Sequence, residues 1–506
     1  MEDTKERMRY GIVNLDLYRY EIHSLVKAFH PTWNLKILVP DDVEEVTREE
    51  NRNRRRAHQP ENFVFEPVLS VTYSKEAVEI TFESTKKRVP APEGINFAAK
   101  SKTLKNALKN ALYDLLTKEA GRTLPWGDLI GIRPTKLASI AMEEGKTKEE
   151  AAKELMQEHF VSPGKAHLAA DIAVREAKIL APLHKSGYSL YVGIPFCPTT
   201  CLYCSFPSYN IALYENVVDD YISALIHELT ESFELVKGKE LNTIYIGGGT
   251  PTSLTAEQLD RLLTAIDRIY PVGQAQEYTV EAGRADSITE DKLKVLLDHN
   301  VTRISVNPQT MNDRTLRLIG RHHSVQQVID TYYLARSLGF TNINMDIILG
   351  LPGEGPEEVA HTVSEIEKLS PDDFTVHSLA IKKASRLREM IDKNGWPVLV
   401  NTEETMRIAA EGAARMGMHP YYLYRQKNMS GNFENTGYAK DGHFGIYNIL
   451  IMEELQTILA CGAGSVTKRV FREGTRIERC DCAKEVGVYI GNIEEMIDRK
   501  RTLFAQ

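Results

Sequence analysis

The chain has 506 residues, which is too long for one ordinary domain and predicts two to four domains. Its 62 basic and 70 acidic residues give a net charge of −8, which offers no support for a nucleic-acid partner held by a general electrostatic field. The N-terminal residues contain no apolar run of signal-peptide type, and no stretch approaches the roughly 20 apolar residues that span a bilayer. These features predict a cytoplasmic protein.

Residues 1–183 are predicted to form an α+β accessory domain. Alternating apolar and polar residues predict three strands, at Tyr10–Leu17, Phe63–Thr72 and Ala77–Phe82. Apolar residues at helical spacing predict helices at 104–116, 147–158 and 164–182. The charged run from Glu44 to Arg56 is interpreted as a solvated loop or helix end. A polyanion-binding patch is the alternative, disfavoured because acidic residues lie beside the arginines.

From 184 to 385, short β-rich runs alternate with helical ones. The predicted strands are Leu190–Ile194, Thr243–Ile246, Tyr278–Glu281, Arg303–Val306, Ile343–Ile347 and Phe374–Ser378. The predicted helices between them are Val217–Leu235, Ala256–Ile269, Glu290–His299, Val325–Leu338 and Pro356–Leu369. This alternation predicts an α/β fold in which six strand–helix units form a partial or full barrel, with functional residues at the carboxyl ends of the strands. Residues 386–506 are predicted to form a mostly helical region that covers the substrate.

Three of the six cysteines lie in one short loop directly after the first barrel strand. Cys197, Cys201 and Cys204 are separated by three and by two residues. A loop this short can offer three thiolates to three irons of one cluster and leave the fourth iron open for chemistry. A closed zinc site is the alternative, disfavoured because no local His or Cys supplies the fourth ligand.

This loop carries a resemblance to a known family. Cys-x₃-Cys-x-Tyr-Cys after a Tyr-x-x-Ile-Pro-Phe lead resembles the radical S-adenosylmethionine (SAM) superfamily, and more narrowly the oxygen-independent coproporphyrinogen III oxidases. The resemblance implies a partial (β/α)6 barrel with a [4Fe–4S] cluster on Cys197, Cys201 and Cys204, whose open iron chelates SAM. Electron transfer from the cluster then cleaves SAM to a 5′-deoxyadenosyl radical, a reaction that belongs to the cofactor.

Further positions resemble the SAM-binding elements of that family. The run Gly247-Gly248-Gly249-Thr250 resembles the element that holds the SAM amino group, although as an isolated motif it could be a plain turn. The resemblance implies that Glu281 binds the ribose, where the alternative is a helix cap, and that Ala380 lines the adenine. The remaining positions implied to contact SAM are Tyr191, Tyr203, Gln309, Arg321 and Asp346.

The whole chain is similar to the HemZ type of coproporphyrinogen dehydrogenase. This similarity implies that two propionates of coproporphyrinogen III are oxidatively decarboxylated to vinyl groups, giving protoporphyrinogen IX in haem biosynthesis. The implied partners are a tetrapyrrole substrate and an electron donor such as flavodoxin or ferredoxin. The substrate carboxylates need cations, and the candidates by residue type are Arg133, Lys136, Arg425 and Lys427, although an ordinary surface charge is the preferred interpretation of each.

Three departures from the family pattern bear on the substrate more than on the cofactor. The usual His of the lead is Gly193, a further cysteine of the best-known bacterial oxidase is Phe206, and the N-terminal region does not resemble that enzyme. One alternative function is therefore a haem-trafficking protein of the same family, with His322 and His323 as candidate ligands. Another is a radical SAM enzyme that acts on a different tetrapyrrole.

The other three cysteines lie near the C-terminus. Cys480 and Cys482 could hold a second metal, but free thiols in a local turn are the preferred interpretation. Cys461 is predicted to pack in the core.

Overall fold

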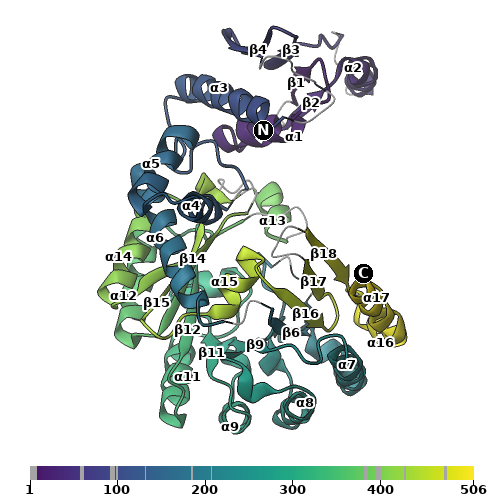
Figure 1. The fold of residues 1–506 in the computed structure, drawn as a ribbon, viewed down its shortest axis with the longest axis vertical. Helices are drawn as coiled ribbons and strands as arrows, with labels where there is room; N and C mark the ends of the chain where they lie inside the picture. Colours follow the sequence, from purple (N-terminus) through teal and green to yellow (C-terminus); the bar gives the residue numbers. More distant parts are fainter. Residues whose placement is uncertain are drawn as a thin grey trace. The chain divides into compact units, whose positions relative to one another are not determined.

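The computed structural model describes residues 8–506 except for 57–61, 92–96, 98–100, 132, 184–185, 205, 207, 381–385, 395–400, 427–428 and 472–475. The chain divides into two compact units (Figure 1). The first comprises Met1–Ala170 and Arg425–Phe433, and the second comprises Asp171–Tyr424 and Glu434–Gln506. Among the described residues, no helix combines the length and the apolar character needed to cross a membrane.

The first unit contains a five-stranded sheet in the order β2–β1–β3–β4–β5. Its strands are β1 (Arg9–Val13), β2 (Leu35–Leu38), β3 (Leu69–Tyr73), β4 (Ala77–Phe82) and β5 (Thr85–Pro90). β1 lies parallel to β2 and β3, whereas β3, β4 and β5 form an antiparallel meander. The strand predicted at Ala77–Phe82 is confirmed, the other two predicted strands overlap β1 and β3 only in part, and β2 and β5 are additional.

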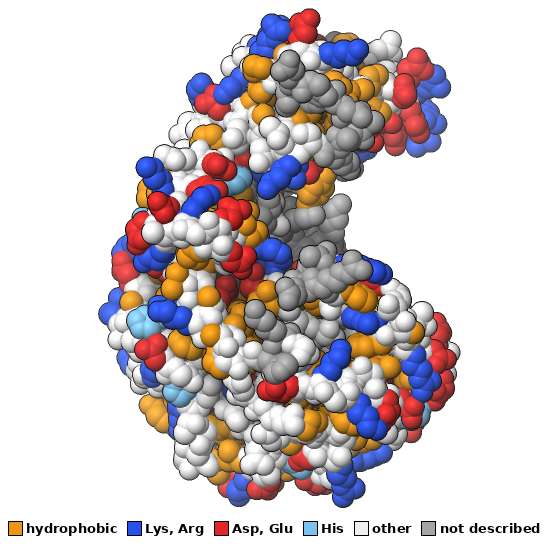
Figure 2. Space-filling view, in the orientation of Figure 1, with side chains coloured by type: hydrophobic (Ala, Val, Ile, Leu, Met, Phe, Trp, Pro, Cys, Tyr) orange, Lys and Arg blue, Asp and Glu red, His pale blue; other side chains and the backbone are white. Residues whose placement is uncertain are grey.

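Helices complete this unit. They are α1 (Arg19–Phe29), α2 (Pro40–Arg56), α3 (Lys102–Ala120), α4 (Pro134–Glu143) and α5 (Lys148–His159), and α6 (Pro163–Leu180) begins in this unit and continues into the second. α1 and α3 pack with the sheet in one apolar core that includes Leu25, Val71, Ile80 and Leu112. α2 carries the charged run and buries no residue, which confirms the solvated interpretation. Figure 2 shows its acidic and basic side chains intermixed at the upper right.

The second unit is built on an eleven-stranded sheet in the order β14–β15–β13–β12–β11–β10–β9–β6–β16–β17–β18. The six predicted barrel strands are confirmed as β6 (Tyr188–Ile194), β9 (Leu241–Gly248), β10 (Glu277–Gly283), β11 (Arg303–Val306), β12 (Ile343–Leu349) and β13 (Asp373–Ser378). Neighbouring strands among these six run parallel. Their carboxyl ends therefore lie along the same edge of the sheet.

The connecting helices match the prediction to within two residues. They are α7 (Val218–Phe233), α8 (Ala256–Ile269), α9 (Glu290–Asp298), α11 (Val325–Leu338) and α12 (Pro356–Leu369), with the short α10 (Asp313–Leu318) as an addition. In Figure 1 the five predicted helices form an outer row around the strands. Thr255 caps α8 and Ser324 caps α11, each through a capping box, which fixes where these helices begin.

The C-terminal region contains more strand than we expected. Its helices are α13 (Arg386–Asn394), α14 (Glu403–Arg415), α15 (Ile446–Glu453), α16 (Val486–Gly491) and α17 (Ile493–Ala505). Its strands are β14 (His419–Tyr424), β15 (Asn435–Ala439), β16 (Thr457–Cys461), β17 (Val466–Phe471) and β18 (Arg476–Asp481). β14 and β18 form the two edges of the sheet. β17 and β18 are half-exposed and rich in charge, so they lack the apolar alternation by which a strand is recognised in sequence.

A fully buried ion pair joins the last two helices to α7. The ammonium of Lys500 bonds the carboxylate of Glu228, and neither side chain is exposed. The second carboxylate oxygen accepts the hydroxyl of Tyr489 at 2.5 Å and the backbone N–H of Gly462 at 2.7 Å. Burial favours the neutral amine, but the opposite charge of Glu228 more than offsets it and raises the pKa of Lys500. Lys500 therefore keeps its positive charge inside the unit.

Replacing Lys500 by Met should destabilise the second unit strongly, because the Glu228 carboxylate would stay buried without its counter-charge. A loss of this kind costs about 3–5 kcal/mol. Thermal unfolding of the cofactor-free protein measures it. Arg501→Ala is the matched control, since Arg501 lies on the same helix as Lys500 and forms exposed ion pairs with Glu231 of α7 and Asp498 of α17. Equal melting temperatures for the two variants would contradict this assignment.

Candidate active site

The cysteine loop leaves β6 at the carboxyl edge of the parallel strands. Its first part, β7 (Phe196–Cys197), pairs in parallel with β8 (Tyr209–Asn210). Farther along, the backbone N–H of Leu202 donates to the carbonyl of Ile319 at 2.9 Å. The three cysteines are half-buried and form no disulfide. Burial raises the pKa of Cys197 to about 11 and also raises that of Cys204, so these thiols are protonated until a metal displaces the protons.

The donor set fits a four-iron cluster. The structure supplies three thiols from one loop at the edge of the sheet, which is the ligand number that leaves one iron open. In the described part of the chain, no three His, Cys, Asp or Glu side chains converge as they would around a single ion. A four-iron cluster does not require such convergence, because each thiolate binds a different iron.

The glycine loop at the end of β9 is bonded to the cysteine loop. The N–H of Gly249 donates to the carbonyl of Ile194, and that of Thr250 donates to the carbonyl of Phe196, each at 2.7 Å. The Thr250 hydroxyl lies 3.4 Å from the sulfur of Cys197. A Cβ atom on Gly249 would lie 2.5 Å from the carbonyl oxygen of Phe196, so only glycine permits this approach.

A stack of tyrosine rings holds Glu281 at the end of β10. The Tyr245 hydroxyl donates to the Glu281 carboxylate. The ring of Tyr245 stacks on Tyr447 at 4.3 Å and on Tyr191 at 6.2 Å between centroids. Burial raises the pKa of Glu281 to about 7, and the negative charge of Asp346 adds to the rise, against the lowering effect of the Tyr245 hydrogen bond. Near neutral pH the carboxyl is therefore poised between its charged and uncharged forms.

Beyond the end of β11, Gln309 pairs with Ile347 inside β12 and has the unusual backbone angle φ of +67°. Its N–H donates to the carbonyl of Asp346 at 2.9 Å. Burial alone would raise the pKa of Asp346, but the nearby His377 ring and the hydrogen bond from the Asn344 amide outweigh it and lower that pKa. A left-handed conformation is uncommon at a residue other than glycine, and here it shapes the backbone between β11 and the helix that follows.

Arg321 joins this edge to the cysteine loop. Its guanidinium donates to the carbonyl of Asn307 at 2.5 Å and to the hydroxyl of Tyr203 at 3.3 Å. Ala380 follows β13 and is half-buried. The predicted positions are thus carried by one edge of the sheet, and their roles as ligands of the cluster and of SAM remain predictions.

Sequence reasoning missed three residues of this edge. Tyr245 points to the site from within β9, and Tyr447 reaches it from α15, far along the chain. Arg284 contacts the cysteine loop from just beyond β10. The alternation of β9 could have revealed Tyr245, but no local pattern marks a residue such as Tyr447 that only tertiary packing brings in.

The cationic candidates for substrate carboxylates differ in their exposure. Arg425 is buried, and its guanidinium donates to the carbonyl of Leu129 and, at 2.7 Å, to the side chain of Asn432. It therefore holds a turn of the first unit and is not available as a surface charge. Arg133 precedes α4, Lys136 is exposed, and Lys427 lies outside the described residues.

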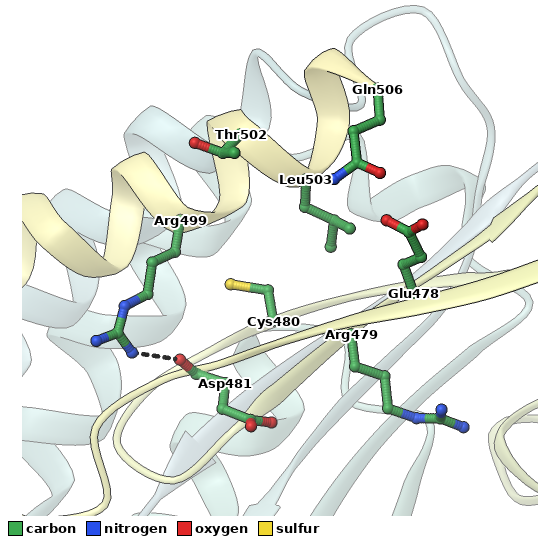
Figure 3. A pocket seen from close by; sticks show the side chains of 8 residues that line it. All are labelled: Glu478, Arg479, Cys480, Asp481, Arg499, Thr502, Leu503 and Gln506. Atoms are coloured by element: carbon green, nitrogen blue, oxygen red, sulfur yellow. Dashed lines mark hydrogen bonds between the residues drawn. The ribbon is translucent and has the colours of Figure 1, made fainter.

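The structure corrects the expected turn at Cys480 and Cys482. Cys480 lies on strand β18 beside a hollow of about 400 Å³, shown in Figure 3. The hollow is lined by Glu478, Arg479, Cys480, Asp481, Arg499, Thr502, Leu503 and Gln506. Cys482 is buried within hydrogen-bonding distance of Glu228 and Lys500. Neither cysteine forms a disulfide, and Cys461 is fully buried in the core, which confirms its packing role.

Gly249→Ala should weaken SAM binding about tenfold, because the added methyl group forces the glycine and cysteine loops apart and such overpacking costs about 1–3 kcal/mol. Equilibrium binding to the reconstituted protein measures it. Gly273→Ala is the matched control, since a Cβ there meets nothing within 4 Å. Unchanged binding by Gly249→Ala would contradict the assigned role of the loop.

Glu281→Gln should stabilise the cofactor-free protein at about pH 8 and lose this advantage near pH 5. The pKa of Glu281 in the folded state, about 7, lies above its ordinary value, so stability of the wild type falls as the pH rises through 7. The advantage of the variant should grow by about 1–3 kcal/mol over that range, as measured by urea unfolding. If the difference in unfolding free energy between Glu281→Gln and the wild type did not change with pH, this would count against a buried, uncharged Glu281.

Comparison with known proteins identifies the family. Residues 191–366 match the family model described as the radical SAM superfamily. The chain is 42% identical over 406 residues to the oxygen-independent coproporphyrinogen-III oxidase-like protein HemZ of Bacillus subtilis, covering 79% of this chain and 81% of that one. It is 32% identical over 262 residues to the haem chaperone HemW of the same organism, covering 51% of this chain and 68% of that one.

The fold agrees with a solved structure of the same superfamily. Coproporphyrinogen III oxidase HemN of Escherichia coli, described as a radical SAM enzyme, aligns with a TM-score of 0.50 at 23% identity, covering 64% of this chain and 73% of that chain. The sheet, the loops at its carboxyl edge and the extent of the HemZ match lead to one conclusion. The chain belongs to the radical SAM family of oxygen-independent coproporphyrinogen III oxidase-like proteins, which use a [4Fe–4S] cluster and SAM.

Proposed function

We propose that this chain catalyses the oxygen-independent oxidative decarboxylation of coproporphyrinogen III to protoporphyrinogen IX in haem biosynthesis. The observation that carries the proposal is the 42% identity to the HemZ relative, which extends over 79% of the chain and so includes more than the cofactor-binding region. The proposed site residues, at the carboxyl edge of the parallel strands, support the same reaction class. An electron donor such as flavodoxin or ferredoxin and a cytoplasmic location belong to this proposal.

The proposed reaction removes CO₂, one hydrogen atom and one electron from each of two propionate side chains and leaves a vinyl group. The cluster with SAM supplies the 5′-deoxyadenosyl radical that takes the hydrogen atom. Cys197, Cys201 and Cys204 would hold that cluster. The electron released by the substrate requires an acceptor, so this reaction needs a redox partner at the end of turnover as well as at its beginning.

The proposed roles of the remaining residues are to orient the cofactor and to exclude water. The glycine loop would hold the SAM amino group in the position that its backbone hydrogen bonds to the cysteine loop give it. The Glu281 carboxylate would accept hydrogen bonds from the ribose hydroxyls, held in place by Tyr245. The tyrosine stack behind Glu281 keeps that part of the site apolar, which protects a radical from side reactions.

A haem chaperone is the second candidate function. It is favoured by the 32% identity to HemW, of which the match covers 68%. Of the two histidines considered as haem ligands, His322 is exposed and His323 is buried, so only His322 is accessible in this structure. A single accessible histidine offers one axial ligand, and the haem would need its second ligand from another group.

Anaerobic incubation of the reconstituted protein with SAM, a strong reductant and coproporphyrinogen III separates these functions. The proposal predicts protoporphyrinogen and CO₂, with one deoxyadenosine formed for each CO₂. The control is Cys201→Ala, which should show no product above background because the cluster would lose one of its ligands. Retention of added haem together with no release of CO₂ would contradict the proposal and support the chaperone.

A further inference from the structure

Arg284 is a buried arginine that reaches the cysteine loop from the end of β10. Its side chain is about 3% exposed. One terminal nitrogen donates to the hydroxyl of Thr199 at 2.8 Å and to the carbonyl of the same residue at 3.1 Å. The same nitrogen lies 3.8 Å from the sulfur of Cys201, within the range of an N–H···S hydrogen bond. Arg284 therefore contacts the loop at the position of its central cysteine.

The guanidinium is fixed from behind by Asp286. Its Nε donates to one carboxylate oxygen at 2.9 Å, and its second terminal nitrogen donates to the other at 2.6 Å. Burial would raise the pKa of Asp286, but the nearby His323 ring and the hydrogen bonds and charge of Arg284 hold it well below its ordinary range. The ring of His323 is buried 3.8 Å from the same carboxylate. A bidentate pair of this kind leaves the guanidinium little freedom to turn.

The backbone of Arg284 is held as well. Its carbonyl accepts the hydroxyl of Ser287 at 2.8 Å, and that hydroxyl lies 2.7 Å from the hydroxyl of Thr252, which follows the glycine loop. The arginine is thus fixed at its backbone, at the rear of its side chain and at the cysteine loop. Such complete fixation goes beyond what a surface ion pair provides and keeps one positive group aimed at one sulfur.

We propose that Arg284 is a positioning residue that sets the reduction potential of the cluster through Cys201. Hydrogen bonds to the cysteine sulfurs and the local charge are among the factors that determine the potential of an iron–sulfur cluster. Reduction adds negative charge, so an N–H donor and a buried cation beside a ligand sulfur stabilise the reduced form and raise the potential. The inference rests on the proposed assignment of Cys201 as a cluster ligand, but not on the identity of the substrate.

A redox titration followed by electron paramagnetic resonance, without SAM or tetrapyrrole, tests the proposal. Arg284→Gln keeps an N–H donor on a shorter side chain and removes the positive charge and the planar guanidinium. This variant should make reduction of the cluster at least tenfold less favourable. For a one-electron couple, that corresponds to a reduction potential lower by 59 mV or more. Arg336→Gln is the matched control. It removes an arginine of α11 that pairs with Asp372 at 2.6 Å, and it should leave the reduction potential unchanged.

The outcomes separate this inference from the proposed function. A full cluster with the wild-type potential in Arg284→Gln would overturn the inference. If that variant binds no cluster, Arg284→Lys is measured instead. It keeps the positive charge but loses the planar guanidinium, so the reduction potential should fall by a smaller amount. An unchanged potential in Arg284→Lys would also overturn the inference. Loss of the cluster from both variants would make Arg284 structural and would likewise refute tuning. Absence of a four-iron signal from the wild type would instead count against the assignment of the cysteines.

Discussion

Two backbone hydrogen bonds join the cysteine loop to the glycine loop, and the arrangement of the site depends on them. They run from Gly249 and Thr250 to the carbonyls of Ile194 and Phe196. Since β6 and β9 are parallel neighbours, both loops leave the same edge, and the glycines let them approach at backbone distance. Once the loops are joined, the cysteines and the proposed SAM-binding backbone occupy fixed positions relative to each other.

Buried charges keep the strands that carry this edge in register. Arg303 of β11 donates to Asp373 of β13 at 2.8 Å, and the hydroxyl of Tyr421 of β14 donates to the same carboxylate at 2.7 Å. The ion pair of Lys500 and Glu228 joins α17 to α7. Glu228 also accepts a hydrogen bond from the N–H of Gly462, which follows β16. Buried pairs of this kind are costly to break, so they favour one arrangement of the sheet over its alternatives.

Much of the barrel could be predicted because its signals are local. Alternating strands and helices identify the six parallel strands, and Cys197, Cys201 and Cys204 are informative by spacing alone. β17 and β18 could not be predicted in this way, since a half-exposed hairpin with charges on both faces has no apolar period. Arg425 was considered for a surface role because residue type gives no information on burial, whereas the structure places it against Leu129 and Asn432.

The site shows the same division between local and tertiary information. The glycine loop and Glu281 could be found from motifs that lie next to a strand. Tyr447 and Arg284 could not, because the first arrives from a distant helix and the second acts through a side chain whose target is set by folding. Residues that stabilise or tune a site are therefore harder to read from sequence than those that bind its cofactor directly.

The central claim is that three thiolates hold a four-iron cluster with one iron open to SAM. The most direct measurement is electron paramagnetic resonance of the anaerobically reconstituted, reduced protein, recorded with and without SAM and followed by analysis for deoxyadenosine. The account predicts a [4Fe–4S] signal that changes on SAM addition, followed by formation of deoxyadenosine. The absence of a four-iron signal would contradict the account. A signal that does not change when SAM is added, together with no formation of deoxyadenosine, would also contradict it.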